Sequence, residues 1–234
     1  MNGQIESKSS SGLPHQAELH YHYAGLQYFG SMSASIAHEI KNALAITNEN
    51  AGLMEDLGLM VIKNGQTLDP ERIIRLSRKV MEQVKRADNI VKKMSRFAHS
   101  VDDPVKMVNI CEVVELTLDL GRRPVASYNI TLEPVLSDSP ISTFTNPFLL
   151  MNLLWLVIQS ACKRVNSDRK IEVSVSKSDK DVNITIGKLI SCKSSCQRDD
   201  LPQMEIIKLA DSLNADVDDS KESRIVITVS PLTK

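Results

Sequence analysis

Several features are scarce in this chain of 234 residues, and each scarcity excludes a class of protein. No window approaches the ~20 uninterrupted apolar residues that a membrane-spanning helix requires. The N-terminus lacks the basic-then-apolar order of a signal peptide, so we expect a cytoplasmic protein. Neither sign of charge dominates, because 28 basic and 29 acidic residues give a formal net charge of −1. Nothing in this balance calls for nucleic acid or a membrane surface as partner.

Cysteine is scarce as well. The four thiols are too few and too unevenly spaced for the disulfide framework of a small secreted protein, so we expect them to be reduced. Cys192 and Cys196 lie close together, but no second pair of Cys or His at finger-like spacing accompanies them, and we expect no metal. A hydrophobic content of 42% is enough for a packed core. Only the serine-rich residues 1–15 are expected to form a loose tail.

The strongest periodic signal is a spacing of seam residues that alternates between three and four positions, which is typical of helices packed side by side. It occurs twice, on either side of a turn that contains Gly65 and Pro70. The seam residues are Ile36, Ile40, Ala43, Thr47, Asn50, Met54, Leu57 and Val61 in the first helix, and Ile73, Ser77, Val80, Val84, Ala87, Val91 and Met94 in the second. Asp69 should cap the second helix, which should end near His99. We therefore predict an α-helical hairpin over residues 16–103.

After residue 103 the pattern changes to shorter elements, and we place a second domain at residues 104–234. Strictly alternating segments at 171–175 and 182–186 flank a polar turn, which predicts a β-hairpin. Further helices are expected at 113–120, 146–165 and 202–213, and further strands at 128–135 and 225–229. This mixture predicts an α+β two-layer sandwich, with one sheet covered on a face by helices.

Within the first helix, the run His38-Glu39-Ile40-Lys41-Asn42 resembles the phosphoacceptor motif of the two-component histidine kinases. His38 falls off the seam and should face water. The resemblance covers the chain from about residue 29 to residue 231, and the second half looks like the family's ATPase domain in its order of elements. It implies a homodimer in which two hairpins form a four-helix bundle. It also implies a response-regulator receiver domain as partner.

Each residue of the motif has a chemical role in such a site. Phosphoryl transfer needs a neutral ring nitrogen as nucleophile, which His38 supplies. Glu39 can accept the proton of the second ring nitrogen or assist attack, with its own partner on the other helix. Asn42 lies one turn further along the same face, where its amide can orient a phosphoryl oxygen, or a water in a phosphatase reaction. Lys41 can steer the phosphorylated aspartate of a receiver, which would bring its own metal.

The chain departs from the family's pattern directly after the motif and in the ATPase-like half. Ala43 stands where proline is usual, so the helix kink expected from proline should be missing. Leu156 and Ser160 stand where two asparagines hold magnesium and phosphate, and Asn152 lies one turn early. Neither leucine nor a lone serine replaces a metal-orienting amide.

Two further losses concern the nucleotide itself. The glycine-rich element that should follow the strand at 182–186 is replaced by residues 187–192, and the aspartate that would recognise adenine is absent. The stretch up to Pro202 is too short for a nucleotide lid and lacks glycines that let backbone amides approach phosphate. We therefore expect no cofactor. ATP and magnesium would bind only if the altered site still functions.

These features favour a histidine phosphotransferase that relays phosphoryl groups between receiver aspartates through His38, without binding ATP. Three alternatives stay open: an ATP-dependent histidine kinase with a divergent nucleotide site, a non-enzymatic pseudokinase scaffold, and a receiver phosphatase. Stabilisation by nucleotide would favour the kinase. Loss of activity on changing Asn42, without phosphorylation of His38, would favour the phosphatase.

Overall fold

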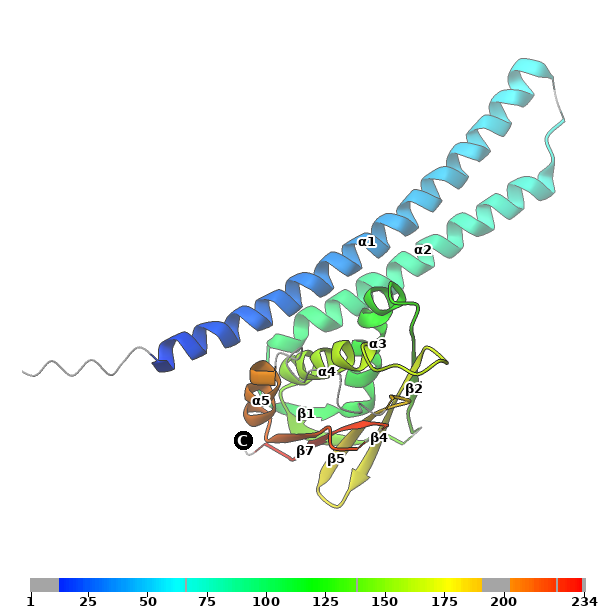
Figure 1. Cartoon of the computed structure of the whole chain (residues 1–234). Coiled ribbons are helices and arrows are strands. Elements are labelled where there is room, and N and C mark those ends of the chain that lie inside the picture. Colours follow the sequence, from blue (N-terminus) through cyan, green and yellow to red (C-terminus); the bar gives the residue numbers. More distant parts are fainter. Residues whose placement is uncertain (1–12, 66, 138, 191–202, 222, 233–234) are drawn as a thin grey trace, which may run out of the picture.

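The computed structural model describes residues 13–65, 67–137, 139–190, 203–221 and 223–232. Two long helices, α1 (Leu13–Asn64) and α2 (Pro70–Ala98), form a hairpin that projects from an α+β domain (Figure 1). The predicted fold class, a helical hairpin followed by an α+β domain, is confirmed. Most of the predicted tail, residues 1–12, lies outside the described residues, as do Cys192 and Cys196.

Local sequence signals determine where the hairpin turns. Gly65 follows α1 with a φ of +62°, a left-handed conformation that glycine adopts without strain. The Asp69 side chain accepts a hydrogen bond from the backbone N–H of Glu71 and caps α2, which begins with Pro70. His99 is the C-cap of α2, as predicted. A short 3₁₀ helix (His99–Val101) follows.

The first helix continues without interruption past Ala43, as expected from the absence of proline at this position. Ala43 is fully buried in the seam of the hairpin, and its carbonyl accepts a hydrogen bond from Thr47 Oγ1 at 2.9 Å. The absence of proline therefore leaves α1 as one helix of 52 residues.

The predicted seam of α1 is correct, because all eight of its residues are buried or half-buried. The predicted seam of α2 is wrong at two positions, since Val84 and Val91 are 55% and 53% exposed. The other five predicted residues are half-buried, so the helix is not rotated as a whole. Beside them a second line runs at intervals of seven, in which Leu76, Ile90 and Phe97 are buried and Gln83 is half-buried.

The second domain contains two sheets. Strands β1 (Lys106–Asn109) and β3 (Ser142–Thr145) form an antiparallel pair. The larger sheet has the order β2-β4-β5-β7-β6, in which β2 runs parallel to β4 and the other pairs are antiparallel. Its strands are β2 (Thr131–Val135), β4 (Lys170–Ser178), β5 (Asp181–Gly187), β6 (Ala215–Asp218) and β7 (Ile225–Val229).

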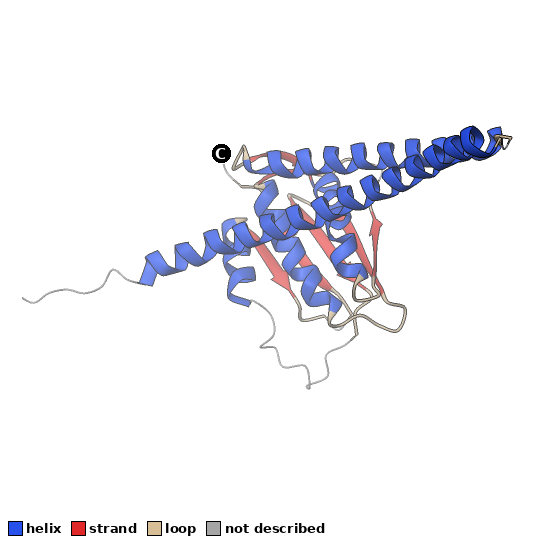
Figure 2. Ribbon diagram, turned by 90° about the horizontal axis from the view of Figure 1, so that it is seen from above, coloured by secondary structure: helices blue, strands red, loops and turns tan. Residues whose placement is uncertain are grey.

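Three helices lie between the hairpin and this sheet, as Figures 1 and 2 show: α3 (Ile110–Ala126), α4 (Pro147–Cys162) and α5 (Gln203–Ser212). All three were predicted, with Pro202 outside the described residues. The predicted β-hairpin and the final strand are also confirmed. The predicted strand over 128–135 begins only at Thr131, because Tyr128 and Asn129 form a turn in which Asn129 has a φ of 57°. Strands β1, β3 and β6 were missed.

Helices α3 and α4 contact each other closely at Gly121. A Cβ atom at this position would lie 2.7 Å from Cζ3 of Trp155, which is only 5% exposed. An added Cβ atom would therefore overlap the indole ring, and the ring or the helix would have to shift. Glycine is therefore required for the packing of α3 on α4.

Replacing Gly121 by alanine should destabilise the protein by about 1–3 kcal/mol, because overpacking outweighs the gain in helix propensity. Urea unfolding followed by circular dichroism measures this change. Gly30 is the matched control: it is exposed, has open space around it, and its replacement by alanine should stabilise the helix by up to about 1 kcal/mol. Equal effects of the two changes would contradict the prediction.

A carboxylate on α3 links the second domain to the hairpin. Asp119 accepts hydrogen bonds from Lys93 of α2, at 2.7 Å, and from Arg122, at 2.9 Å. Partial burial tends to raise the pKa of the Asp119 carboxyl, but the two cations outweigh it and lower the pKa. The folded pKa then lies below the unfolded one, so this stabilisation is present above about pH 4 and is lost as the pH falls through the lowered value.

Replacing Asp119 by asparagine should lower the melting temperature at pH 7 by a few degrees, and the difference from the wild type should shrink below about pH 4. Differential scanning calorimetry across pH 3–7 tests this. The control is Asp88→Asn, since Asp88 forms only an exposed pair with Lys92 on its own helix. A constant difference at every pH would contradict the proposed cause.

Candidate functional site

The predicted phosphoacceptor lies midway along α1. His38 is exposed, and so are Lys41 and Asn42, whereas Glu39 is half-buried. The residues that hold this turn in place are Ile36, which is 5% exposed, and the fully buried Ala43. The buried residues Ile36 and Ala43 thus fix the backbone of this turn, and the imidazole of His38 lies in solvent, as predicted from its position off the seam.

The four candidate side chains do not pair with one another. Within the described part of the chain, none of His38, Glu39, Lys41 and Asn42 forms a hydrogen bond or an ion pair. The partner expected for Glu39 on the second helix is therefore not found among the described residues. His38 and Asn42 are one turn apart and share a face of the helix.

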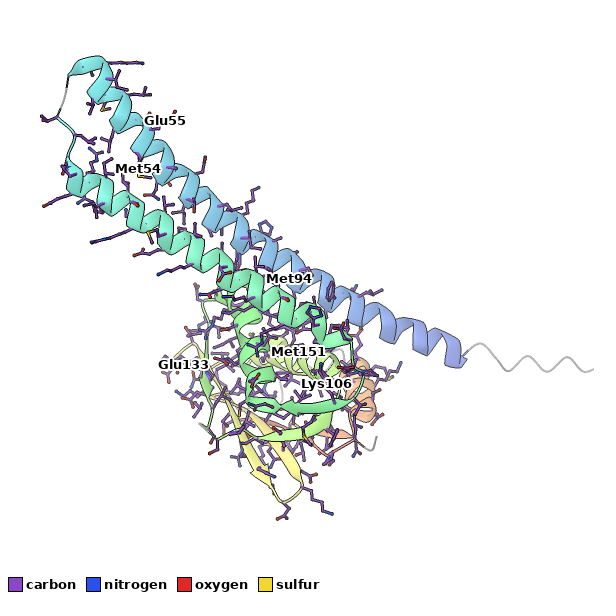
Figure 3. The ribbon with its side chains drawn as sticks, turned by 180° about the vertical axis from the view of Figure 1, so that it is seen from behind. Met54, Glu55, Met94, Lys106, Glu133 and Met151 are labelled. Carbon is purple, nitrogen blue, oxygen red and sulfur yellow. The ribbon has the colours of Figure 1, made fainter. Side chains whose placement is uncertain are left out.

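His38 lies at the level where the hairpin meets the second domain. Ile36 belongs to the hydrophobic core of that domain, and Ile40 and Met94 pack against the same core. Figure 3 shows Met94 on α2 where this helix passes over the second domain. The phosphoacceptor turn is therefore adjacent to both parts of the molecule.

Charged residues around this junction were not identified from the sequence. Lys93 pairs with Asp119, and Arg96 pairs with Glu112 at 3.3 Å, so two basic residues of α2 reach acidic residues of α3. The sequence did contain a signal for these contacts, because Lys93 and Arg96 lie about one turn apart near the end of α2. Their acidic partners could be assigned only once the packing of α3 was known.

A cavity of about 650 Å³ lies between α4, α5 and the edge formed by β6 and β7. Apolar residues of α4 and α5 line it, and its charged lining residues among those that the structure describes are all acidic: Asp211, Asp216, Asp218 and Asp219. Arg164 pairs with Asp219, and Lys221 lies 3.7 Å from Asp218, but no lysine or arginine lines the cavity itself among the described residues.

The residues that replace the expected nucleotide-binding asparagines do not converge on this cavity. Ser160 lines it, but Leu156 does not; both residues line a second cavity of about 380 Å³ next to Trp155. Asn152 is 2% exposed, inside the core. No group of three or more His, Cys, Asp or Glu side chains suited to a metal ion occurs in the described ranges. Among the same residues, no helix is long and apolar enough to cross a membrane.

Comparison of the sequence with protein-family models and with curated proteins finds no match. Comparison with solved structures finds similar folds. The histidine kinase AdeS of Acinetobacter baumannii is 14% identical, with a TM-score of 0.45, over 84% of this chain and 98% of that one. The catalytic domain of the histidine kinase ThkA is 11% identical, with a TM-score of 0.45, over 54% and 96% of the two chains. The mycobacterial sensor histidine kinase MprB is 14% identical, with a TM-score of 0.43, over 54% and 99%.

Proposed function

We propose that the protein carries a phosphoryl group on His38 and exchanges it with aspartates of response-regulator receiver domains, without using ATP. The observation that carries this proposal is the environment of His38. Its imidazole is exposed and has no partner among the described residues, while Ile36 and Ala43 on either side are buried and fix the helix. A nucleophile of this kind is open to in-line approach.

The transfer itself needs few groups from this chain. A neutral ring nitrogen of His38 attacks the phosphorus of the receiver's aspartyl phosphate. The N–P bond forms as the bond from phosphorus to the aspartate oxygen breaks, and the carboxylate leaves. Glu39 takes the proton from the other ring nitrogen, Asn42 orients a phosphoryl oxygen, and Lys41 attracts the acidic receiver site. The reverse reaction returns the group to a receiver.

The acidic cavity supports the part of the proposal that excludes ATP. A nucleotide triphosphate is strongly anionic, and lysines, arginines or bound cations normally neutralise its phosphates. Here the charged lining consists of four aspartates, two of which, Asp211 and Asp216, have no ion-pair partner among the described residues. Phosphate would be repelled from such a surface.

The exposed apolar residues of the hairpin favour association with a second copy of the chain. The two exposed positions of the predicted seam, Val84 and Val91, continue an apolar stripe on α2 that includes Ile74 and Met81. On α1, Ile46, Leu53 and Met60 are exposed at intervals of seven. Apolar stripes with this period are buried when two hairpins associate in a four-helix bundle, and we propose that homodimer.

The proposed phosphate source is tested by incubating the protein with radiolabelled ATP and magnesium, and separately with prephosphorylated receiver domains. Label should reach the protein from receivers only, and His38→Ala should abolish it. His99→Ala is the control, because His99 is an exposed histidine outside the motif. Label taken directly from ATP would establish a kinase. Label from neither source would favour a scaffold, or a phosphatase if the receivers lose phosphate in the presence of His38→Ala but not of Asn42→Ala.

The proposed dimer is tested by placing charge on the apolar stripe. Val84→Glu should convert the dimer to a monomer, because an unpaired carboxylate would be buried in the bundle. Size-exclusion chromatography with light scattering measures the mass. Met107→Glu introduces the same charge at an exposed apolar position of the second domain and should leave the mass unchanged. A wild-type protein that is already monomeric would refute this part of the proposal.

A further inference from the structure

The lower part of the hairpin and the second domain share one hydrophobic core. Tyr28, Met32 and Ile36 of α1 and Ile90 and Phe97 of α2 belong to the same buried cluster as the apolar residues of α3, α4 and the five-stranded sheet. Met32 and Phe97 are fully buried. Interfaces between independently folded domains are usually more polar than this.

The contact centres on the ring of Phe97, near the end of α2. The rings of Phe29 and Tyr28, both from α1, lie 5.1 Å and 5.6 Å from it, and that of Phe148, from α4, lies at 6.2 Å. Tyr28 and Phe148 also approach each other directly, at 5.8 Å. Three helices from the two parts of the chain therefore meet in one aromatic cluster.

Tyr28 and Phe97 are buried at this junction, whereas Phe29 and Phe148 are half-buried. The hydroxyl of Tyr28 is buried and has no hydrogen-bond partner among the described residues. A domain that separated from the hairpin would hydrate this hydroxyl, but it would also expose the rings of Phe97 and Phe148. Apolar burial on this scale outweighs one unsatisfied polar atom, so the docked arrangement is favoured.

The shared core ends at the level of His38. Further along the hairpin, Ala43 and Leu76 are buried, but they are not part of the common cluster. The tip beyond them projects away from the second domain, so that α1 and α2 face only each other there (Figure 1), and it exposes several large apolar residues. Two different packing environments thus meet at the phosphoacceptor turn.

We infer that the base of the hairpin, up to His38, and the second domain unfold as one cooperative unit, and that the tip of the hairpin is a separate and less stable one. The second domain then keeps a fixed position beside His38 and does not move as a rigid body relative to the base of the hairpin. This inference goes beyond the proposed function and does not depend on phosphoryl transfer.

Hydrogen–deuterium exchange of the full chain, read by mass spectrometry, tests this arrangement. Amides of residues 28–37 and 90–97 should exchange with the same apparent free energy as those of β4, β5 and β7, while residues 50–62 and 73–80 exchange faster. Measurement at several protein concentrations separates any contribution of dimerisation to the tip.

Three substitutions and one control variant distinguish the possible outcomes. Tyr28→Phe removes the buried unsatisfied hydroxyl and should slow exchange by up to about tenfold, in the hairpin base and in the central strands together. Tyr128→Phe is its control, because Tyr128 is 63% exposed, and should change nothing. Ile184→Val, in the sheet core, should speed exchange of residues 28–37 as much as that of β5 itself, although Ile184 lies in a central strand. Leu76→Ala should speed exchange of the tip alone.

The inference fails if Tyr28→Phe or Ile184→Val changes protection only in its own part of the chain, since the two parts would then unfold independently. It also fails if Leu76→Ala speeds exchange of the base as much as that of the tip, because the boundary at His38 would not exist. Neither outcome bears on whether His38 accepts a phosphoryl group, which the labelling experiment decides separately.

Discussion

The arrangement of the whole molecule depends on the burial of Phe97 at the end of α2. This ring contacts Tyr28 and Phe29 of α1 and Phe148 of α4. Its position determines how α2 is rotated about its axis, because a helix without a kink carries the same rotation along its length. The residues one, two and three heptads before Phe97 therefore face inward: Ile90, Gln83 and Leu76. This orientation leaves Val84 and Val91 exposed, on an apolar stripe that continues through Met81 and Ile74 towards the tip of the hairpin.

The difference between the two predicted seams shows what a sequence pattern can determine. On α1 all eight predicted seam residues were assigned correctly. On α2 two sets share every second seam position and differ by one residue at the positions between, where one set has Val84 and Val91 and the other has Gln83 and Ile90. Periodicity cannot choose between them. The choice depends on Phe148, about 50 residues further along the chain.

In other parts of the fold, too, features with a local sequence signal were predicted, and features that depend on contacts between distant segments were not. Caps, the β-hairpin at Asp179 and the buried helix α4 have local signals and were predicted. Strands β1, β3 and β6 have four residues each, too few for an alternating pattern to stand out. The exposure of His38 was predictable from its place off the seam. Its position beside the second domain was not, because it depends on contacts between distant segments of the chain.

The departures of the second domain from the expected nucleotide-binding pattern and the acidic charge of its cavity point in the same direction. Taken alone, the absence of the asparagine expected at Leu156 or at Ser160 could be offset by an amide side chain nearby. The fold rules out Asn152 for that task by burying it, and it gathers aspartates from α5 and the β6 region around the cavity. Under the proposed function, the charge of this cavity and the packing of the helices into the base of the hairpin both oppose delivery of phosphate from the second domain to His38. The proposed donor, a receiver domain, approaches from solvent on the exposed face of α1.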